Sequence, residues 1–354
     1  MLAALPSCLL ATDVPKKAKA LPHTGEFFRF LDPVTETPVV RLTNIRSNSF
    51  LPAPTNRFVS VKDRFLIFSS DRRGSLAPFQ LDLHTGLVSQ LAKPEKLQPE
   101  SLCLNGKRNA IYFLDGDTLQ EVMLSNRRSR VLVENVSSFC EMGGASDGTP
   151  SFVIVRQGRL ETLNSGSKVL AHEVESFCLT RPGGRGCVFQ KVASAAQREL
   201  WYASFSAPAN PVLLARGKMT NPVWAPDGKA LLFLREVARP NGVASEIHSV
   251  SPEAPTEQRV AATSQFAAFS PNADASVFVG ASRSKAQPTV LLLVASVQRE
   301  FTLCEHRASH PAAVSPVFSP DSKRVYFQSD HEGKSALYSV NVESLVESTS
   351  GNDS

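Results

Sequence analysis

The residues of this 354-residue chain that could do chemistry are seven histidines, six cysteines and 33 carboxylates. No two cysteines form a Cys-x-x-Cys pair, and no cysteine–histidine group has the spacing of a zinc site. The chain also has no phosphate-binding loop of the Gly-x-x-x-x-Gly-Lys type. Local motifs therefore predict no active site, and any site has to be assembled by the fold from separate segments.

Most of the histidines stand where a solvated or structural role is expected. His84 and His331 fall in turn motifs, and His248 lies on a predicted strand. His172 and His306 lie near the ends of predicted strands. Only His310, which stands just before the last repeat of the chain, is kept as a candidate metal ligand.

A repeat organises the elements that must position these residues. Ser-Pro-Asp, Ala-Pro-Asp and Ser-Pro-Asn turns, each placed between a short strand and an apolar strand, occur at residues 319–321, 225–227 and 270–272. Weaker copies continue upstream, with starts near residues 63, 107, 148, 183, 225, 271 and 319. Each unit holds about four short strands, which is typical of propeller blades.

The sequence therefore predicts an all-β fold, a seven-bladed β-propeller with four-stranded blades, over residues 21–346 as a single domain. The last unit ends after its third strand, and residues 37–43 supply a spare strand near the chain start. We expect this N-terminal strand to close the ring as the outer strand of the last blade, because closure hides exposed sheet edges. Residues 347–354 are predicted to be a disordered polar tail.

In a propeller the innermost strand of each blade lines the central channel, and ligands gather where these strands begin. The fourth positions of the aligned strand starts are apolar and predict core packing; they are Cys103, Cys140, Cys178, Trp224, Phe269 and Phe318. The first positions are mostly polar; they are Glu100, Ser137, Glu175, Asn221, Phe266 and Ser315. We expect the polar members to ring the channel mouth, where they either bind a ligand or only solvate the surface.

Charge and hydropathy restrict the partners. The formal net charge is +5, and the basic residues are spread along the chain, whereas a nucleic-acid binder gathers them on one face. The balance predicts no nucleic acid and fits a weak preference for acidic ligands such as uronic acids. No apolar run is long enough for a transmembrane helix.

Residues 1–20 could be the remnant of an export signal. Met1 to Thr12 is apolar, and Ala18-Lys19-Ala20 is a possible cleavage site, but the positive segment that opens a signal peptide is missing. The run is similar to the apolar part of a twin-arginine signal with an upstream start. We expect an exported, periplasmic protein, or a cytoplasmic one if this segment is only a loose tail.

The repeat spanning Ser319 to Tyr338 resembles that of TolB-like propellers, and more specific motifs resemble the oligogalacturonate lyases. These motifs are Val39-Val-Arg-Leu-Thr43, Leu81-Asp-Leu-His-Thr-Gly86, Asn221-Pro-Val-Trp-Ala-Pro-Asp-Gly228 and His310-Pro311. The resemblance covers residues 38–343. It implies a seven-bladed lyase that cleaves short pectin fragments by β-elimination, with a divalent metal, typically manganese, held by histidines at the channel mouth.

The chain departs from the family pattern at the implied metal site. Where the resemblance implies His-Pro-His before the last blade, this sequence has Ala313, Val314 and Ser315. Asn221 and Phe266 stand where histidines are implied in the fifth and sixth blades, with Gln265 beside the second. The metal site therefore looks degenerate.

Two hypotheses remain open. In the first, the protein is an oligogalacturonate-lyase-like enzyme on acidic oligosaccharides, with Arg198, which is one residue out of step with the family's arginine, as the base. His310 is then the candidate metal ligand, and the candidate substrate contacts are Glu100, Glu175, Asn221, Gln265 and Ser315. In the second, a propeller without catalysis or metal binds a ligand or a protein at the channel mouth. The oligomeric state stays open, and a monomer fits both.

Overall fold

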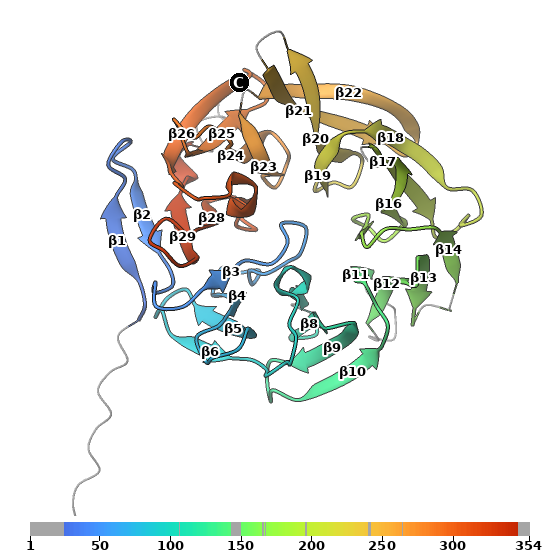
Figure 1. The fold of residues 1–354 in the computed structure, drawn as a ribbon, viewed down its shortest axis with the longest axis horizontal. Coiled ribbons are helices and arrows are strands. Elements are labelled where there is room, and N and C mark those ends of the chain that lie inside the picture. Colours follow the sequence, from blue (N-terminus) through green and yellow to red (C-terminus); the bar gives the residue numbers. More distant parts are fainter. Residues whose placement is uncertain are drawn as a thin grey trace, which may run out of the picture.

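The computed structural model describes residues 25–345, except residues 106, 143–149, 165, 167, 195–196, 240–241 and 264. The predicted segments 1–20 and 347–354 lie outside the described residues. Seven antiparallel sheets surround a central channel, and the chain visits them in sequence order (Figure 1). The predicted seven-bladed propeller is confirmed.

The first four blades each contain four strands. Blade 1 contains β3 (Ser49–Phe50), β4 (Phe65–Ser70), β5 (Ala77–Asp82) and β6 (Val88–Gln90). Blade 2 contains β7 (Cys103–Asn105), β8 (Ala110–Asp115), β9 (Thr118–Met123) and β10 (Ser129–Val133). Blade 3 contains β11 (Ser138–Met142), β12 (Ser151–Arg156), β13 (Arg159–Leu163) and β14 (Val169–His172). Blade 4 contains β15 (Cys178–Thr180), β16 (Gly186–Ser194), β17 (Gln197–Ser204) and β18 (Val212–Gly217).

Blades 5 and 6 repeat this plan, and blade 7 combines both ends of the chain. Blade 5 contains β19 (Met219–Trp224), β20 (Leu231–Arg239), β21 (Gly242–Ser251) and β22 (Ala254–Thr263). Blade 6 contains β23 (Phe266–Pro271), β24 (Val277–Ser282), β25 (Thr289–Val294) and β26 (Arg299–Glu305). Blade 7 contains β27 (Val317–Phe318), β28 (Arg324–Ser329) and β29 (Ala336–Asn341), followed by β2 (Pro38–Arg41) and β1 (Phe28–Leu31).

The ring closes as predicted, with one addition. β2 pairs antiparallel with β29, with Val40 opposite Ser339, and so provides the fourth strand of blade 7 (Figure 1). β1, which the sequence analysis did not predict, pairs with β2 as a fifth strand. Its four residues, Phe-Arg-Phe-Leu, show no buried side chain, so β1 lies on the edge of the blade, although the alternation of Phe28 and Phe30 could have indicated a strand.

The core lies between neighbouring blades. Every residue of β24 and β25 is buried, because the middle strands of a blade are covered on both faces by adjacent sheets. Cys103, Cys140 and Cys178 are buried as expected, and desolvation raises the pKa of the Cys103 thiol to about 12. Their role in this structure is packing.

Three innermost strands, β7, β15 and β27, begin two or three residues later than predicted. The 3-10 turns η1 (Pro99–Ser101) and η2 (Pro311–Val314) precede β7 and β27. Each turn begins with a proline, whose fixed φ and missing N–H suit the start of a helical turn and not a sheet ladder. Glu100 therefore lies on a turn, and Ser315 ends η2 with a left-handed φ of 47°. Among the described residues, no helix has the length and hydropathy needed to cross a membrane.

Candidate functional site

Two adjoining hollows lie on the face of the ring where the innermost strands begin, which we call the mouth face. They have volumes of about 660 and 650 Å³ and share Ser137, Gln157 and Ser176. Their walls come from the segments before β11 and β15 and from the turns between the second and third strands of blades 2 and 3. Antiparallel pairing puts these segments on one face. We call the two together the mouth hollows.

The lining of the mouth hollows is rich in side-chain amides and hydroxyls. The amides belong to Gln98, Asn135, Gln157 and Gln190, and the hydroxyls to Ser137 and Ser176. Gln157 and Gly158 both have positive φ, of 51° and 72°, which is the backbone of a tight turn between twisted strands. Such amide and hydroxyl groups donate and accept hydrogen bonds, as the hydroxyls of a sugar do.

Glu175 and Arg198 meet at the edge of the mouth hollows. Glu175 lines one hollow, and its Oε2 lies 2.9 Å from Nε of Arg198. Arg198 lies near the tip of the β16–β17 hairpin, where its Nη1 donates to the Ser194 carbonyl over 3.3 Å. The backbone N–H of Glu175 donates to the Gln190 carbonyl over 2.9 Å, which fixes the segment before β15 against the same hairpin.

The pair is accessible to a ligand. The side chains of Arg198 and Glu175 expose 36% and 28% of their surface. An arginine side chain is positively charged throughout the physiological pH range, and a neighbouring carboxylate favours that charge. A protonated guanidinium binds a carboxylate well but has no free lone pair with which to remove a proton.

The other candidates on the mouth face are separate from this pair. Glu100 is exposed on η1, where its backbone carbonyl accepts from Ala53 N over 3.1 Å. Asn221 lies at a bulge of β19 with a φ of 53°. Gln265 Oε1 accepts a hydrogen bond from Ser282 Oγ over 2.6 Å, and Ser315 follows η2. None of these four lines the mouth hollows.

His310 lies in a different and smaller hollow of about 160 Å³, between blades 7 and 1. Gln328 in the same hollow accepts from Leu51 N and donates to the Ala313 carbonyl. Asp330 accepts from the backbone N–H of Ser309 over 2.8 Å and from its hydroxyl. The polar groups around the exposed His310 are therefore already engaged within the protein.

His306 lies fully buried between β26 and η2. Its Nε2 lies 3.0 Å from the Ser282 carbonyl, and its Nδ1 lies 3.0 Å from the backbone N–H of Ala308. These contacts assign Nε2 as the protonated nitrogen and Nδ1 as the acceptor. Burial lowers the pKa of His306, which keeps the ring neutral. With both nitrogens engaged, His306 is a structural residue, as its position near a strand end suggested.

The donors present do not fit a manganese site. Manganese in proteins takes imidazole and carboxylate ligands together. Within the described ranges there is no group of three or more His, Cys, Asp or Glu side chains placed to share an ion. His306 has no free nitrogen, and the carboxylate next to His310 is bonded to Ser309. These residues therefore do not support a metal-dependent step.

The sequence analysis found Ser137, Glu175 and Arg198 but missed the amides around them. Gln157 stands before Gly158 between two predicted strands, which is a turn signal that could have placed its side chain on the mouth face. Gln190 lies within β16, and no sequence signal distinguishes it from other polar strand residues.

The class that these observations define is a single-ring, seven-bladed β-propeller with polar hollows at the channel mouth. No family model matches the sequence, and no curated protein matches it significantly. The fold is similar to an oligogalacturonate lyase solved in complex with manganese, with a TM-score of 0.76 and 20% identity over 89% of this chain and 96% of that one.

A second oligogalacturonate lyase, from Vibrio parahaemolyticus, matches with a TM-score of 0.74 and 18% identity over 89% of this chain and 96% of that chain. Hydrazine synthase from Kuenenia stuttgartiensis matches more distantly, with a TM-score of 0.55 and 10% identity over 81% and 95%. The predicted resemblance to the lyases is thus confirmed at the level of the fold. Proteins with different chemistry share the architecture, so the function depends on the site.

Proposed function

We propose that this protein binds acidic oligosaccharides at the mouth face, with one uronate carboxylate on Arg198 and the sugar hydroxyls in the mouth hollows. The observation that supports this most is the exposed Glu175–Arg198 pair beside a hollow lined by amides and hydroxyls. Nε and Nη1 of Arg198 are engaged within the described residues, and the remaining N–H donors of the guanidinium face no described acceptor.

Charge explains why an acid is the preferred ligand. A charge-assisted hydrogen bond from a guanidinium to a carboxylate is roughly twice as strong as a neutral one. Glu175 and Asp117 already place two negative charges at the mouth hollows, so the ligand carboxylate has to share the guanidinium of Arg198 against this repulsion. We therefore expect modest affinity, which several sugar–amide hydrogen bonds raise to a useful level.

β-elimination is a second candidate, and the fold similarity to two oligogalacturonate lyases favours it. In that reaction a base takes the C5 proton, a C4–C5 double bond forms, and the C4–O bond breaks as the leaving oxygen gains a proton. The protonated Arg198 suits binding of the adjacent carboxylate better than it suits the role of the base.

The test uses the full chain with trigalacturonate and, as a neutral probe, maltotriose, and measures binding by calorimetry. We expect binding of trigalacturonate only, and a loss of about tenfold or more in Arg198→Gln, since a charged hydrogen bond contributes about 1.5–3 kcal/mol. Arg216→Gln is the matched control, because Arg216 is also an exposed, ion-paired arginine of blade 4. Its affinity should equal that of the wild type.

Equal affinity for maltotriose and trigalacturonate, or an Arg198→Gln variant that binds as the wild type does, would overturn the proposal. The same samples separate binding from catalysis through the ultraviolet absorbance of the conjugated unsaturated product. A rise that depends on the protein and disappears in Arg198→Gln would establish a lyase. A flat trace together with trigalacturonate binding would establish the binding propeller.

A further inference from the structure

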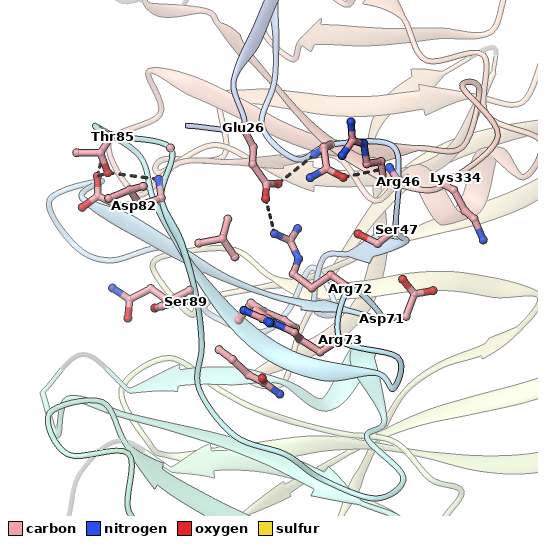
Figure 2. A pocket seen from close by; sticks show the side chains of 17 residues that line it. Glu26, Arg46, Ser47, Asp71, Arg72, Arg73, Asp82, Thr85, Ser89 and Lys334 are labelled. Atoms are coloured by element: carbon pink, nitrogen blue, oxygen red, sulfur yellow. Dashed lines mark hydrogen bonds and ion pairs between the residues drawn. The ribbon is translucent and has the colours of Figure 1, made fainter. Parts of the chain in front are cut away.

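A groove with a volume of about 1180 Å³ runs along the outer flank of blade 1, away from the mouth hollows (Figure 2). Its walls come from β5 and β6, the segment between β2 and β3, the turn after β4, and residues 25–26, and the side chain of Lys334 reaches it from blade 7. We call it the flank groove. It is larger than either mouth hollow and is lined by charged and hydroxyl-bearing side chains.

The three carboxylates that line the flank groove are bonded within the protein. Glu26 accepts from Arg72 Nη1 over 2.6 Å and from the backbone N–H of Asn44 over 3.1 Å. Asp71 accepts from the backbone and side-chain amides of Asn48, over 2.8 and 2.7 Å. Asp82 accepts from Thr85 and His84, and the Thr85 N–H lowers the pKa of its carboxyl.

The cations of the groove outnumber these acids and are less engaged. Arg46, Arg73 and Lys334 are exposed, and none of their side chains forms an ion pair with a described carboxylate. Figure 2 shows them around the groove, with the Arg72 guanidinium between them and facing Glu26. With Arg72 included, four positive side chains face three internally bonded negative ones.

Arg72 places a largely buried positive charge in the wall of the groove. Its side chain is 12% exposed and lies over the rings of Phe68 and Phe79, at 5.1 and 5.2 Å from their centroids. Nη1 bonds Glu26 and Nε donates to Ser70 Oγ, but the buried Nη2 has no hydrogen-bond partner among the described residues. Because Nη2 is buried, Arg72 contributes a fixed positive charge to the groove and not a free donor.

We propose that the flank groove is an oxyanion-binding site, in which Arg73, Arg46 and Lys334 donate to a carboxylate or phosphate oxygen and Arg72 adds its positive charge. Ser47, Ser89 and Gln90 line the same groove and can bond hydroxyls next to the anion. This site is separate from the mouth hollows, although its cations lie on the same face of the ring, and it does not rest on the function proposed there.

The experiment titrates the full-length chain with inorganic phosphate and with glucuronate, and uses glucose as the neutral probe. All variants carry Arg198→Gln, so that binding at the mouth hollows does not contribute. We expect both anions to bind and glucose not to bind. The double variant Arg73→Gln, Lys334→Gln should bind phosphate about tenfold or more weakly, since each exposed charge contributes up to about 1 kcal/mol. Both side chains are exposed, so folding is preserved.

A second variant tests the sign of the electrostatics. Glu26→Gln removes the charge that neutralises Arg72 but keeps an acceptor for its guanidinium, so phosphate should bind about threefold to tenfold more tightly. Lys62→Gln is the control, because Lys62 is an exposed cation of the same blade that does not line the groove. It should leave binding unchanged.

The two anions also distinguish the source of the oxyanion. If the natural ligand is a sugar acid, Ser89→Ala should weaken the binding of glucuronate but not that of phosphate. If the natural ligand is a phosphate, Ser89→Ala should leave the binding of both anions unchanged. Absence of binding by both anions would overturn the site. The site would also be overturned if Lys62→Gln weakened phosphate binding as much as the double variant does. That result would show that the net charge of the protein attracts the anion, and not the groove.

Discussion

The mouth face carries two kinds of surface. In blades 2–4 the polar side chains line open hollows, and the Glu175–Arg198 pair stands exposed at their edge. In blades 5–7, where the family resemblance implied a metal, two of the polar side chains bond the protein itself. Gln265 bonds Ser282, and His306 bonds the backbone on both sides.

The difference teaches where a ligand can find free donors on this scaffold. A polar group that already bonds the blades together contributes to stability, and a ligand would have to break that bond to use it. The side chains of Gln157 and Ser176 form no hydrogen bond with a described residue and stay available to a ligand, whereas Gln98 and Ser137 already donate to backbone carbonyls. We therefore assign stability to the polar residues of blades 5–7 and binding to those of blades 2–4, and each prediction below tests one side of this comparison.

The largest effect is expected on the free energy of unfolding, from a polar residue of blades 5–7. His306→Ala removes a buried ring and two hydrogen bonds, so it should lower the free energy of unfolding by about 3 kcal/mol. Trigalacturonate affinity of the folded variant should not change. Urea denaturation and calorimetry measure the two quantities. A loss below about 1 kcal/mol, or a loss of affinity in the folded protein, would contradict the assignment of His306 to structure.

His306 should also make the stability of the protein depend on pH. Because the pKa of His306 is lowered in the folded state, its contribution to stability is fully present above the ordinary value of 6.5 and is lost as the pH falls toward the folded value. On lowering the pH from 7 to 5, the change in unfolding free energy of the wild type should therefore be less favourable than that of His306→Ala by about 1 kcal/mol, because other groups such as Glu141 titrate equally in both proteins. Urea denaturation of both proteins at the two pH values measures this difference; parallel pH profiles would contradict the role of His306.

The next effect is on the binding side. Glu175→Gln removes the carboxylate that shares Arg198 with the ligand and keeps an amide acceptor in its place. We expect trigalacturonate to bind more tightly by about 1 kcal/mol, roughly fivefold, the upper range for an exposed pair. Maltotriose serves as the control, since no charge is involved. Weaker binding of trigalacturonate would mean that Glu175 itself contacts the sugar hydroxyls.

The sequence predicted the ring because its signals are local. Pro-Asp turns followed by apolar strands recur from residue 225 to residue 321, and each unit can be recognised by itself. The site was only partly predictable. Glu175 and Arg198 were both named, but their contact depends on the length of the β16–β17 hairpin, in which β16 ends at Ser194 and β17 begins at Gln197.

The flank groove could not be predicted at all. Its cations belong to three segments of the sequence, around residues 46, 72 and 334, and only closure of the ring brings Lys334 to blade 1. The position of the Arg72 charge is also a property of packing, because it follows from the positions of Phe68, Phe79 and Glu26. Turn and strand patterns hold no information on such contacts.

A smaller effect is expected at the opposite end of β11, away from the mouth hollows. Glu141 is half-buried and accepts from Asn105 Nδ2, and burial raises its pKa to about 7. A raised carboxyl pKa gives stability that is fully present below the ordinary value of 4.5 and is lost as the pH rises through about 7. As the pH rises from 5 to 8, the free energy of unfolding of Glu141→Gln should therefore increase by about 1 kcal/mol relative to that of the wild type, allowing for solvent screening.

Thermal or urea denaturation at the two pH values measures this gain, and trigalacturonate binding should be the same in both proteins. The binding control matters to the comparison, because Ser137, next to the other end of β11, lines the mouth hollows. If Glu141→Gln changed the affinity, the ligand would extend through the channel and binding would not be confined to the mouth face.

The smallest effect is expected from manganese. Binding of an ion only to the folded state stabilises it by about 2.7 kcal/mol at a concentration one hundred times the dissociation constant. Because the nitrogens of His306 and the carboxylate of Asp330 are engaged, the donors near η2 offer a metal little beyond the exposed ring of His310. We therefore expect millimolar manganese to shift the melting temperature by less than about 1 °C. His310→Ala should behave as the wild type does; a larger shift that this variant abolished would place a metal in blade 7 and reverse the division between the two halves of the mouth face.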